Sequence, residues 1–179
     1  PILALACDIA AVVEGRDPWR RSHRSVDVAE RLQGLRVFRE NPRSADVDRA
    51  VCQALERVAS QLKHRAGRIS VEHSKLDADP GVLLSLAYPD RIARRRDADS
   101  LRYRLANGRG ATLPVDDPLA RSEYLVVANL NAANADATMY LAAEVHWEDV
   151  EELHGHRVTR EEEIRWNARE QAVNAREVH

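Results

Sequence analysis

The spacing of apolar residues changes near residue 90, and this change limits the fold to a helical part followed by a part built of strands. Between Val47 and Leu62 the apolar residues recur with the period of an amphipathic helix. Over residues 101–106 they alternate with arginine or alanine, which is typical of a strand with one buried face. The order of the two patterns predicts an α+β fold.

Four helices are expected before the change, and the apolar stripes of the first three predict a bundle over residues 1–88. The first begins at an apolar residue without a cap, so we expect the sequence to be part of a longer chain. The first expected helix covers residues 2–14. The second is capped by Ser25 and ends near Asn41 and Pro42, and the third is capped by Ser44 and ends near Gly67. The fourth is short and runs from Asp79 to Ala87, where Pro89 stops it.

Strands are expected after the change, with one short acidic helix at residues 147–153. The segment 124–130 is almost continuously apolar, which predicts a strand buried on both faces. Strands of this length predict a small barrel of the oligonucleotide-binding kind over residues 89–155. Residues 156–179 are expected to form a C-terminal β-hairpin, in which the strand holding Ile164 and Trp166 pairs with residues 172–178 across a turn near Asn167.

The composition is that of a globular protein, with 44% hydrophobic and 31% charged residues. No apolar run approaches the roughly 20 residues that a membrane-spanning helix needs, so no membrane partner is expected. The two cysteines, Cys7 and Cys52, fall on apolar faces of expected helices and lack metal-site or redox spacing. We therefore expect both to be reduced core residues of a cytoplasmic protein.

The sequence lacks the motifs of several common enzymes. Neither Lys63 nor Lys75 follows a glycine, so there is no ATP-binding P-loop, and HExxH and GxSxG are also absent. Gly108-Arg109-Gly110 begins like the dinucleotide-binding motif GxGxxG, but the position of the third glycine is Leu113 and no helix follows. We therefore expect a turn at these glycines. His154 and His156 are too few for a zinc site. No catalytic residue and no metal ligand are therefore expected in this chain.

Arginines gather at the start of the strand region. Over residues 91–109, seven arginines stand against two aspartates, a local charge of +5, whereas the segment from Glu144 onwards carries −5. Such a patch predicts an anionic partner, and barrels of this type bind single strands through basic faces. A solvated face paired with the acidic C-terminal segment is an equally weighted alternative. The candidate nucleic-acid contacts are Arg91, Arg94, Arg95, Arg96, Arg102, Arg104, Asn107 and Arg109.

The alternation predicts which way these side chains point. Arg102 and Arg104 are expected to point away from the face that Tyr103 shares with its apolar neighbours, and Tyr103 is expected in the core. If Ile92 points into the barrel, then Arg94 and Arg96 point inward as well, unless a bulge or the barrel rim frees them. With aromatic residues at only 4%, the patch favours contact with the nucleic-acid backbone over contact with bases.

Four segments of the chain resemble one protein family. They read LLSLAYPDRIARRR, LANGRGATLP, DPLA and YLVVANL, and they are similar to the region beyond the motor domains of HrpB, a family of bacterial DEAH-box ATP-dependent RNA helicases. The resemblance implies a helicase-associated helical region at residues 1–88 and an oligonucleotide-binding-type barrel from residue 90 to about 150. It also implies that residues 156–179 begin the family's C-terminal region.

The resemblance implies a parent enzyme that couples ATP hydrolysis to movement along RNA. In related helicases the helical and barrel domains form part of the single-strand channel, and the barrel can receive regulatory proteins. ATP and Mg²⁺ are implied only for the motor domains, whose P-loop and DEAH box this sequence lacks, so this chain is expected to hydrolyse nothing. By position, Arg91, Arg94 to Arg96, Asn107 and Arg109 belong to the matching motifs, and Arg102 and Arg104 flank them.

Two hypotheses follow for the function. The first is an accessory part of an RNA helicase that contacts single-stranded RNA or another nucleic acid through its arginines. The second is a protein-interaction module whose arginines contact the motor domains of the parent chain or a regulatory partner, without touching RNA.

Overall fold

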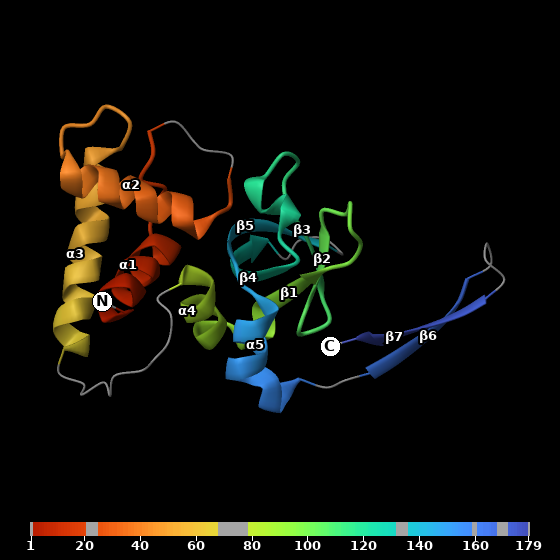
Figure 1. Cartoon of the computed structure of the whole chain (residues 1–179). Coiled ribbons are helices and arrows are strands. Elements are labelled where there is room, and N and C mark those ends of the chain that lie inside the picture. The colour runs from red at the N-terminus through yellow and green to blue at the C-terminus, as the bar shows by residue number, and fades with distance from the viewer. Residues whose placement is uncertain are drawn as a thin grey trace.

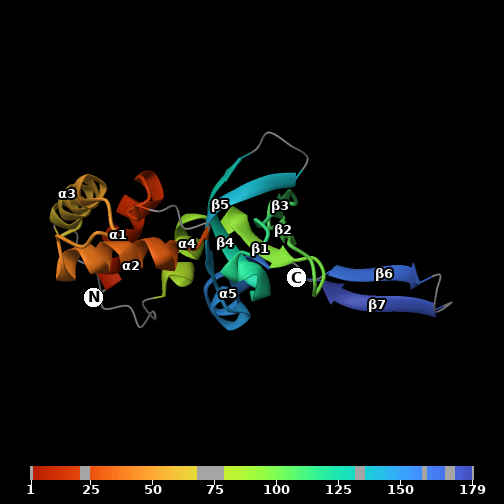
Figure 2. The same cartoon turned by 90° about the horizontal axis from the view of Figure 1, so that it is seen from above.

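The computed structural model describes residues 2–20, 25–67, 79–131 and 136–158, together with two strands at residues 161–167 and 172–178. A helical layer lies beside a small barrel, and the last two strands project from the barrel's far side (Figures 1 and 2). The α-helices are α1 (Ile2–Glu14), α2 (Val28–Glu40), α3 (Arg49–Ala66), α4 (Pro80–Ala87) and α5 (Trp147–His154), and the short 3-10 helices are η1 (Pro89–Arg91), η2 (Pro118–Arg121) and η3 (Gly155–Arg157). The strands are β1 (Ile92–Arg95), β2 (Arg102–Leu105), β3 (Gly110–Thr112), β4 (Tyr124–Asn131), β5 (Asp136–Glu144), β6 (Glu161–Asn167) and β7 (Ala172–Val178).

The helix caps differ from two of the sequence predictions. Helix α2 is capped by Asp27, whose carboxylate accepts from the backbone N–H of Ala29, and not by Ser25. Helix α3 is likewise capped by Asp48 and not by Ser44. In both cases the residues before the helix are held extended by distant partners: Val26 is buried in the barrel core, and Val47 pairs with Trp19. Helical turns therefore cannot begin earlier, and the next good capping residue takes the role.

Five strands close into a barrel in the order β1-β2-β3-β5-β4, and the mixed α+β class is confirmed. All neighbours run antiparallel except β3 and β5, which run parallel. This order is consistent with an oligonucleotide-binding-like barrel. Strands β6 and β7 form a separate two-stranded antiparallel sheet, with Asn167 opposite Ala172.

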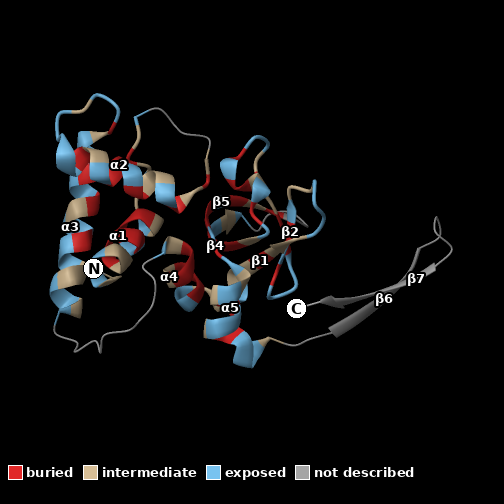
Figure 3. Cartoon of the chain, in the orientation of Figure 1, coloured by how far each residue is buried: buried red, intermediate tan, exposed pale blue. Residues whose placement is uncertain are grey.

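Strand β4 explains how the helices and the barrel are joined. Its side chains alternate between two hydrophobic cores: Leu125 and Val127 point into the barrel, whereas Val126 and Ala128 pack against the helices. The prediction of a strand buried on both faces is confirmed (Figure 3). The core of helices α1 to α4 thus continues onto the outer face of the barrel.

Cys7 and Cys52 are buried free thiols, as the sequence predicts, and burial raises the pKa of both. Within the described residues, no helix combines the length and the apolar character that crossing a membrane requires.

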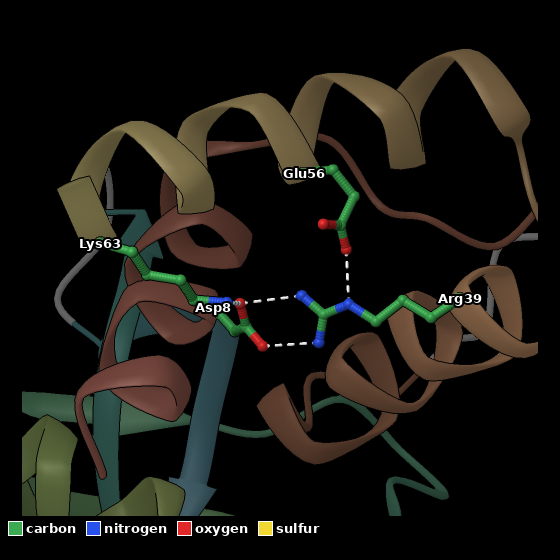
Figure 4. A network of polar contacts seen from close by, with 4 residues as sticks. All are labelled: Asp8, Arg39, Glu56 and Lys63. Atoms are coloured by element: carbon green, nitrogen blue, oxygen red, sulfur yellow. Dashed lines mark hydrogen bonds and ion pairs between the residues drawn. The ribbon is translucent and has the colours of Figure 1, made fainter. Parts of the chain in front are cut away.

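A polar network ties the first three helices together (Figure 4). The carboxylate of Asp8 on α1 accepts two hydrogen bonds from the Arg39 guanidinium on α2, at 2.7 and 2.9 Å, and one from the Lys63 ammonium on α3, at 3.1 Å. Arg39 also donates to Glu56 on α3. Burial alone would raise the pKa of Asp8, but these donors outweigh it and hold that pKa below its ordinary value.

The network predicts an acid-sensitive helical layer. Because the folded-state pKa of Asp8 is depressed, its contribution to stability is present above the unfolded-state pKa of about 3.9 and is lost as the pH falls through the folded value. We expect Asp8→Asn to lower the free energy of unfolding by about 1–2 kcal/mol at pH 7, since Arg39 and Lys63 are each 36% exposed and water can solvate them.

The measurement is urea unfolding of wild type and Asp8→Asn at pH 7 and at steps below pH 4. The gap between the two proteins should close as the pH falls. The exposed Asp99→Asn serves as the control and should follow wild type throughout. A gap that stays constant with pH would show that the Asp8 carboxylate does not carry this stability.

Candidate nucleic-acid interface

Strand β2 carries two arginines on the outer face of the barrel. Its burial alternates as the sequence predicts: Tyr103 and Leu105 are buried inside, whereas Arg102 and Arg104 are exposed. Strand β1 pairs with β2 so that Arg94 lies directly opposite Arg104. Side chains directly opposite on neighbouring strands lie on the same face, so these three arginines share one outer surface.

The orientation of β1 differs from the conditional prediction that placed Ile92 in the barrel. Ala93 is the residue whose side chain enters the barrel core, and Ile92 packs outside, against the helical core. Arg94 therefore points outward without a bulge. Arg95 shares the inward side of Ala93, but it lies at the end of the strand, where its guanidinium reaches the backbone carbonyl of Ala120 at 3.0 Å.

Tyr103 is a structural residue of the barrel. Its side chain is fully buried, and its hydroxyl donates to the backbone carbonyl of Ser122 at 2.8 Å, next to the carbonyl of Leu119. Burial raises the pKa of the phenol. The prediction that Tyr103 lies in the core is confirmed, and its ring cannot stack on a base.

Arg91 also forms contacts within the protein. It ends η1, and its guanidinium donates to the backbone carbonyl of Ala128 at 2.9 Å and lies 5.0 Å from the centre of the Tyr88 ring. Ala128 sits where the pairing of β4 with β5 shifts register between Val127 and Asn129. A bulge leaves a backbone group without its ladder partner. The Arg91 guanidinium supplies a hydrogen-bond donor for the Ala128 carbonyl at this bulge.

The glycine-bracketed loop is the turn that the sequence predicts. It joins β2 to β3, and Gly108 has a φ of +84°, which glycine adopts without steric cost. The side-chain oxygen of Asn107 accepts from the backbone N–H of Arg109 at 3.1 Å and so stabilises the turn. Asn107 and Arg109 are both exposed at the end of the hairpin.

The eight candidate residues thus divide into two groups. Arg91 and Arg95 donate to backbone carbonyls, and Asn107 stabilises its turn. Among the described residues, Arg96, Arg104 and Arg109 form no salt bridge with an acidic side chain. The remaining arginines lie on β1 and β2 or next to these strands in the sequence, and their side chains are exposed or half-buried. They are Arg94, Arg96, Arg102, Arg104 and Arg109, and we call this set the basic face.

Two aromatic residues beside the basic face were missed from the sequence. Tyr124 lies directly opposite Arg94 in the pairing of β1 with β4, and the Arg94 guanidinium is 5.7 Å from the centre of its ring. The indole of Trp147, the first residue of α5, lies 5.5 Å from the Tyr124 ring, centre to centre. The pairing of β1 with β4 brings residues 94 and 124 together. This contact could therefore not be predicted without knowing which residues of the two strands lie opposite each other.

His154, the last residue of α5, has structural surroundings. His154 is buried, and its Nε2 lies 3.0 Å from the hydroxyl oxygen of Ser85 on α4. Since that hydroxyl already donates to the Val82 carbonyl, the ring N–H is the donor to it. Burial lowers the pKa of His154, so the neutral form is favoured. Across the described residues, no group of three or more histidine, cysteine or acidic side chains could hold a metal ion.

Comparison with known proteins gives a consistent set of matches. The chain is 37% identical over 122 residues to the ATP-dependent RNA helicase HrpB of Escherichia coli (strain K12), and the match covers 65% of this chain and 15% of that protein. Crystal structures of E. coli HrpB, described as a DExH-box NTPase and as a DEAH/RHA helicase, match with TM-scores of 0.62 and 0.57 and identities of 28% and 26%. Both matches cover 97% of this chain but 19% of the longer one. No family model matches the chain.

Proposed function

We propose that this chain, which is similar in sequence and in fold to a part of HrpB helicases, is an accessory region of a helicase of that kind and contacts single-stranded RNA through its basic face. ATP hydrolysis, with its Mg²⁺, would belong to motor domains elsewhere in the parent protein, acting in the cytoplasm. This chain has no P-loop in which a nucleotide could be held.

The observation that carries the proposal is the direct pairing of Arg94 with Arg104. Like charges opposite each other on neighbouring strands destabilise a sheet. Arg102 adds a third guanidinium on the same face two residues along β2, where the exposed residues are both arginines. A polyanion whose phosphates lie along Arg102 and Arg104 on β2 would reduce this repulsion, and release of its counterions would favour binding.

The test is a titration of single-stranded RNA against wild type and Arg102→Glu/Arg104→Glu at low and moderate salt. We expect wild-type binding to weaken steeply with salt and the variant to lose at least about 10-fold in affinity, because two phosphate contacts become repulsive. Arg36→Glu/Arg57→Glu, on exposed positions of α2 and α3, makes the same charge change away from the barrel and should bind like wild type. Wild type that does not bind at low salt would refute the proposal for this chain.

A second candidate is a protein-interaction module that docks on the motor domains or on a regulatory protein. It is supported by exposed apolar side chains outside the basic face: Leu86 on α4 is 47% exposed, and Val115 after β3 is 74% exposed. In this case the arginines would pair with acidic side chains of the partner. The RNA titration separates the two candidates, since only the first requires binding by this chain alone.

A further inference from the structure

Three side chains from separate elements lie next to one another at the edge of the basic face. Arg94 comes from β1, Tyr124 from β4 and Trp147 from α5. The guanidinium of Arg94 lies over the Tyr124 ring, and the Tyr124 and Trp147 rings are inclined by 33°. Both rings are half-buried and pack at the margin of the helical core, so their positions are fixed by the fold. Arg94 is therefore held by a rigid aromatic support.

The surroundings of Arg94 favour contact with a base over contact with a phosphate. Its Nε lies 3.6 Å from the carboxylate of Glu123, which is itself 59% exposed. That carboxylate offsets part of the arginine's charge and would repel a phosphate brought to the same place. The Arg94 side chain is 38% exposed, so a ligand can reach part of it.

We propose that Arg94, supported by Tyr124 and Trp147, is a stacking platform for one nucleobase of a single-stranded RNA whose phosphates lie along Arg102 and Arg104. Nucleobases stack on arginine planes as well as on aromatic rings, with little dependence on sequence. The aromatic support limits the motion of Arg94 before binding, which reduces the entropy lost when a base is bound. This inference rests on the function proposed above.

A second arginine–aromatic contact, that of Arg91 with Tyr88, does not offer an equivalent site. Arg91 lies over Tyr88, but its guanidinium is committed to the Ala128 carbonyl inside the bulge of β4. The ring of Tyr103 is fully buried. Within the described part of the chain, Arg94 is thus the guanidinium that combines an aromatic neighbour, a partly exposed side chain and a place beside Arg104.

The test compares two probes: an oligouridylate of about ten nucleotides, within the site size of such barrels, and an oligomer of the same length and charge that lacks the bases. We expect wild type to bind the oligouridylate at least about 5-fold more tightly. Arg94→Lys keeps the charge but removes the planar group. It should bring the ratio of the two affinities close to one, while its affinity for the abasic probe changes by less than about 2-fold.

Arg104→Lys is the matched control, because no aromatic ring among the described residues lies against Arg104. It should keep the wild-type ratio. An unchanged ratio in Arg94→Lys would overturn the inference, and so would a wild-type protein that binds both probes equally. Either result would leave the proposed RNA contact standing. Failure of wild type to bind either probe would instead refute the proposed function, and the stacking platform with it.

Discussion

The Gly81→Ala variant is expected to lose about 3 kcal/mol or more of its free energy of unfolding, at or above the upper end of the usual cost of overpacking. Gly81 is buried in the first turn of α4, where the helix packs on the end of β5. A Cβ atom at this position would lie 1.8 Å from the backbone carbonyl oxygen of Glu144 and 2.8 Å from its carbon. Both are main-chain atoms, so no side-chain rotation relieves the clash.

The measurement is urea and thermal unfolding of wild type, Gly81→Ala and a matched control, Gly155→Ala. Gly155 has a φ of −52°, and a Cβ there would meet its nearest neighbour at 3.9 Å, an ordinary contact. The control should be unchanged or more stable by up to about 1 kcal/mol, because alanine restricts the unfolded chain. A Gly81→Ala protein as stable as wild type would contradict the close packing of α4 on β5.

Asp117→Ala is expected to destabilise the protein by about 2–5 kcal/mol, because it leaves two buried N–H groups without an acceptor. The Asp117 carboxylate is 5% exposed and accepts from the backbone N–H of Val26 at 2.8 Å and of Leu119 at 2.9 Å. Val26 belongs to the linker between α1 and α2, and its carbonyl accepts from the N–H of Ala142 on β5. One carboxylate thus joins the helical layer to the barrel.

Asp117→Asn provides the internal comparison for this effect. It keeps one side-chain oxygen as an acceptor, so urea unfolding should show a loss of about half that of Asp117→Ala. The neighbouring Asp116→Asn removes the same charge from an exposed residue with a φ of 66°, which asparagine tolerates, and should leave the stability unchanged. Equal losses in the two Asp117 variants would show that the hydrogen bonds are not the cause.

The periodicity of the sequence predicts much of the fold because it reflects which face of each element is buried. The alternation over β2 correctly assigns Tyr103 and Arg104 to opposite faces, and the apolar run of β4 correctly predicts a strand between two cores. The helix caps were predicted less well, since aspartate and serine are both favoured at the N-cap and the local sequence does not choose between Asp27 and Ser25. The choice depends on where Val26 is anchored, and its anchor, Asp117, lies far along the chain.

In the candidate site, too, the orientation of side chains depends on contacts between distant parts of the sequence. The sequence locates the arginines, but it does not separate Arg94, which points outward, from Arg95, which donates to the Ala120 carbonyl. Their orientation depends on Ile92, an apolar residue that packs outside the barrel because the helical core covers that part of the surface. Tyr124 reaches Arg94 only through the pairing of β1 with β4. Such long-range pairings cannot be read from local patterns.

The salt dependence of RNA binding tests the central claim most directly, because its slope counts the phosphates that the protein neutralises. For single strands the logarithm of the affinity falls by about 0.7 per neutralised phosphate for each tenfold rise in salt. Arg102→Gln/Arg104→Gln should therefore lower the slope by about 1.4 relative to wild type, whereas Arg36→Gln/Arg57→Gln should keep it. An unchanged slope in the first variant, or an equal fall in the second, would contradict RNA binding along the basic face.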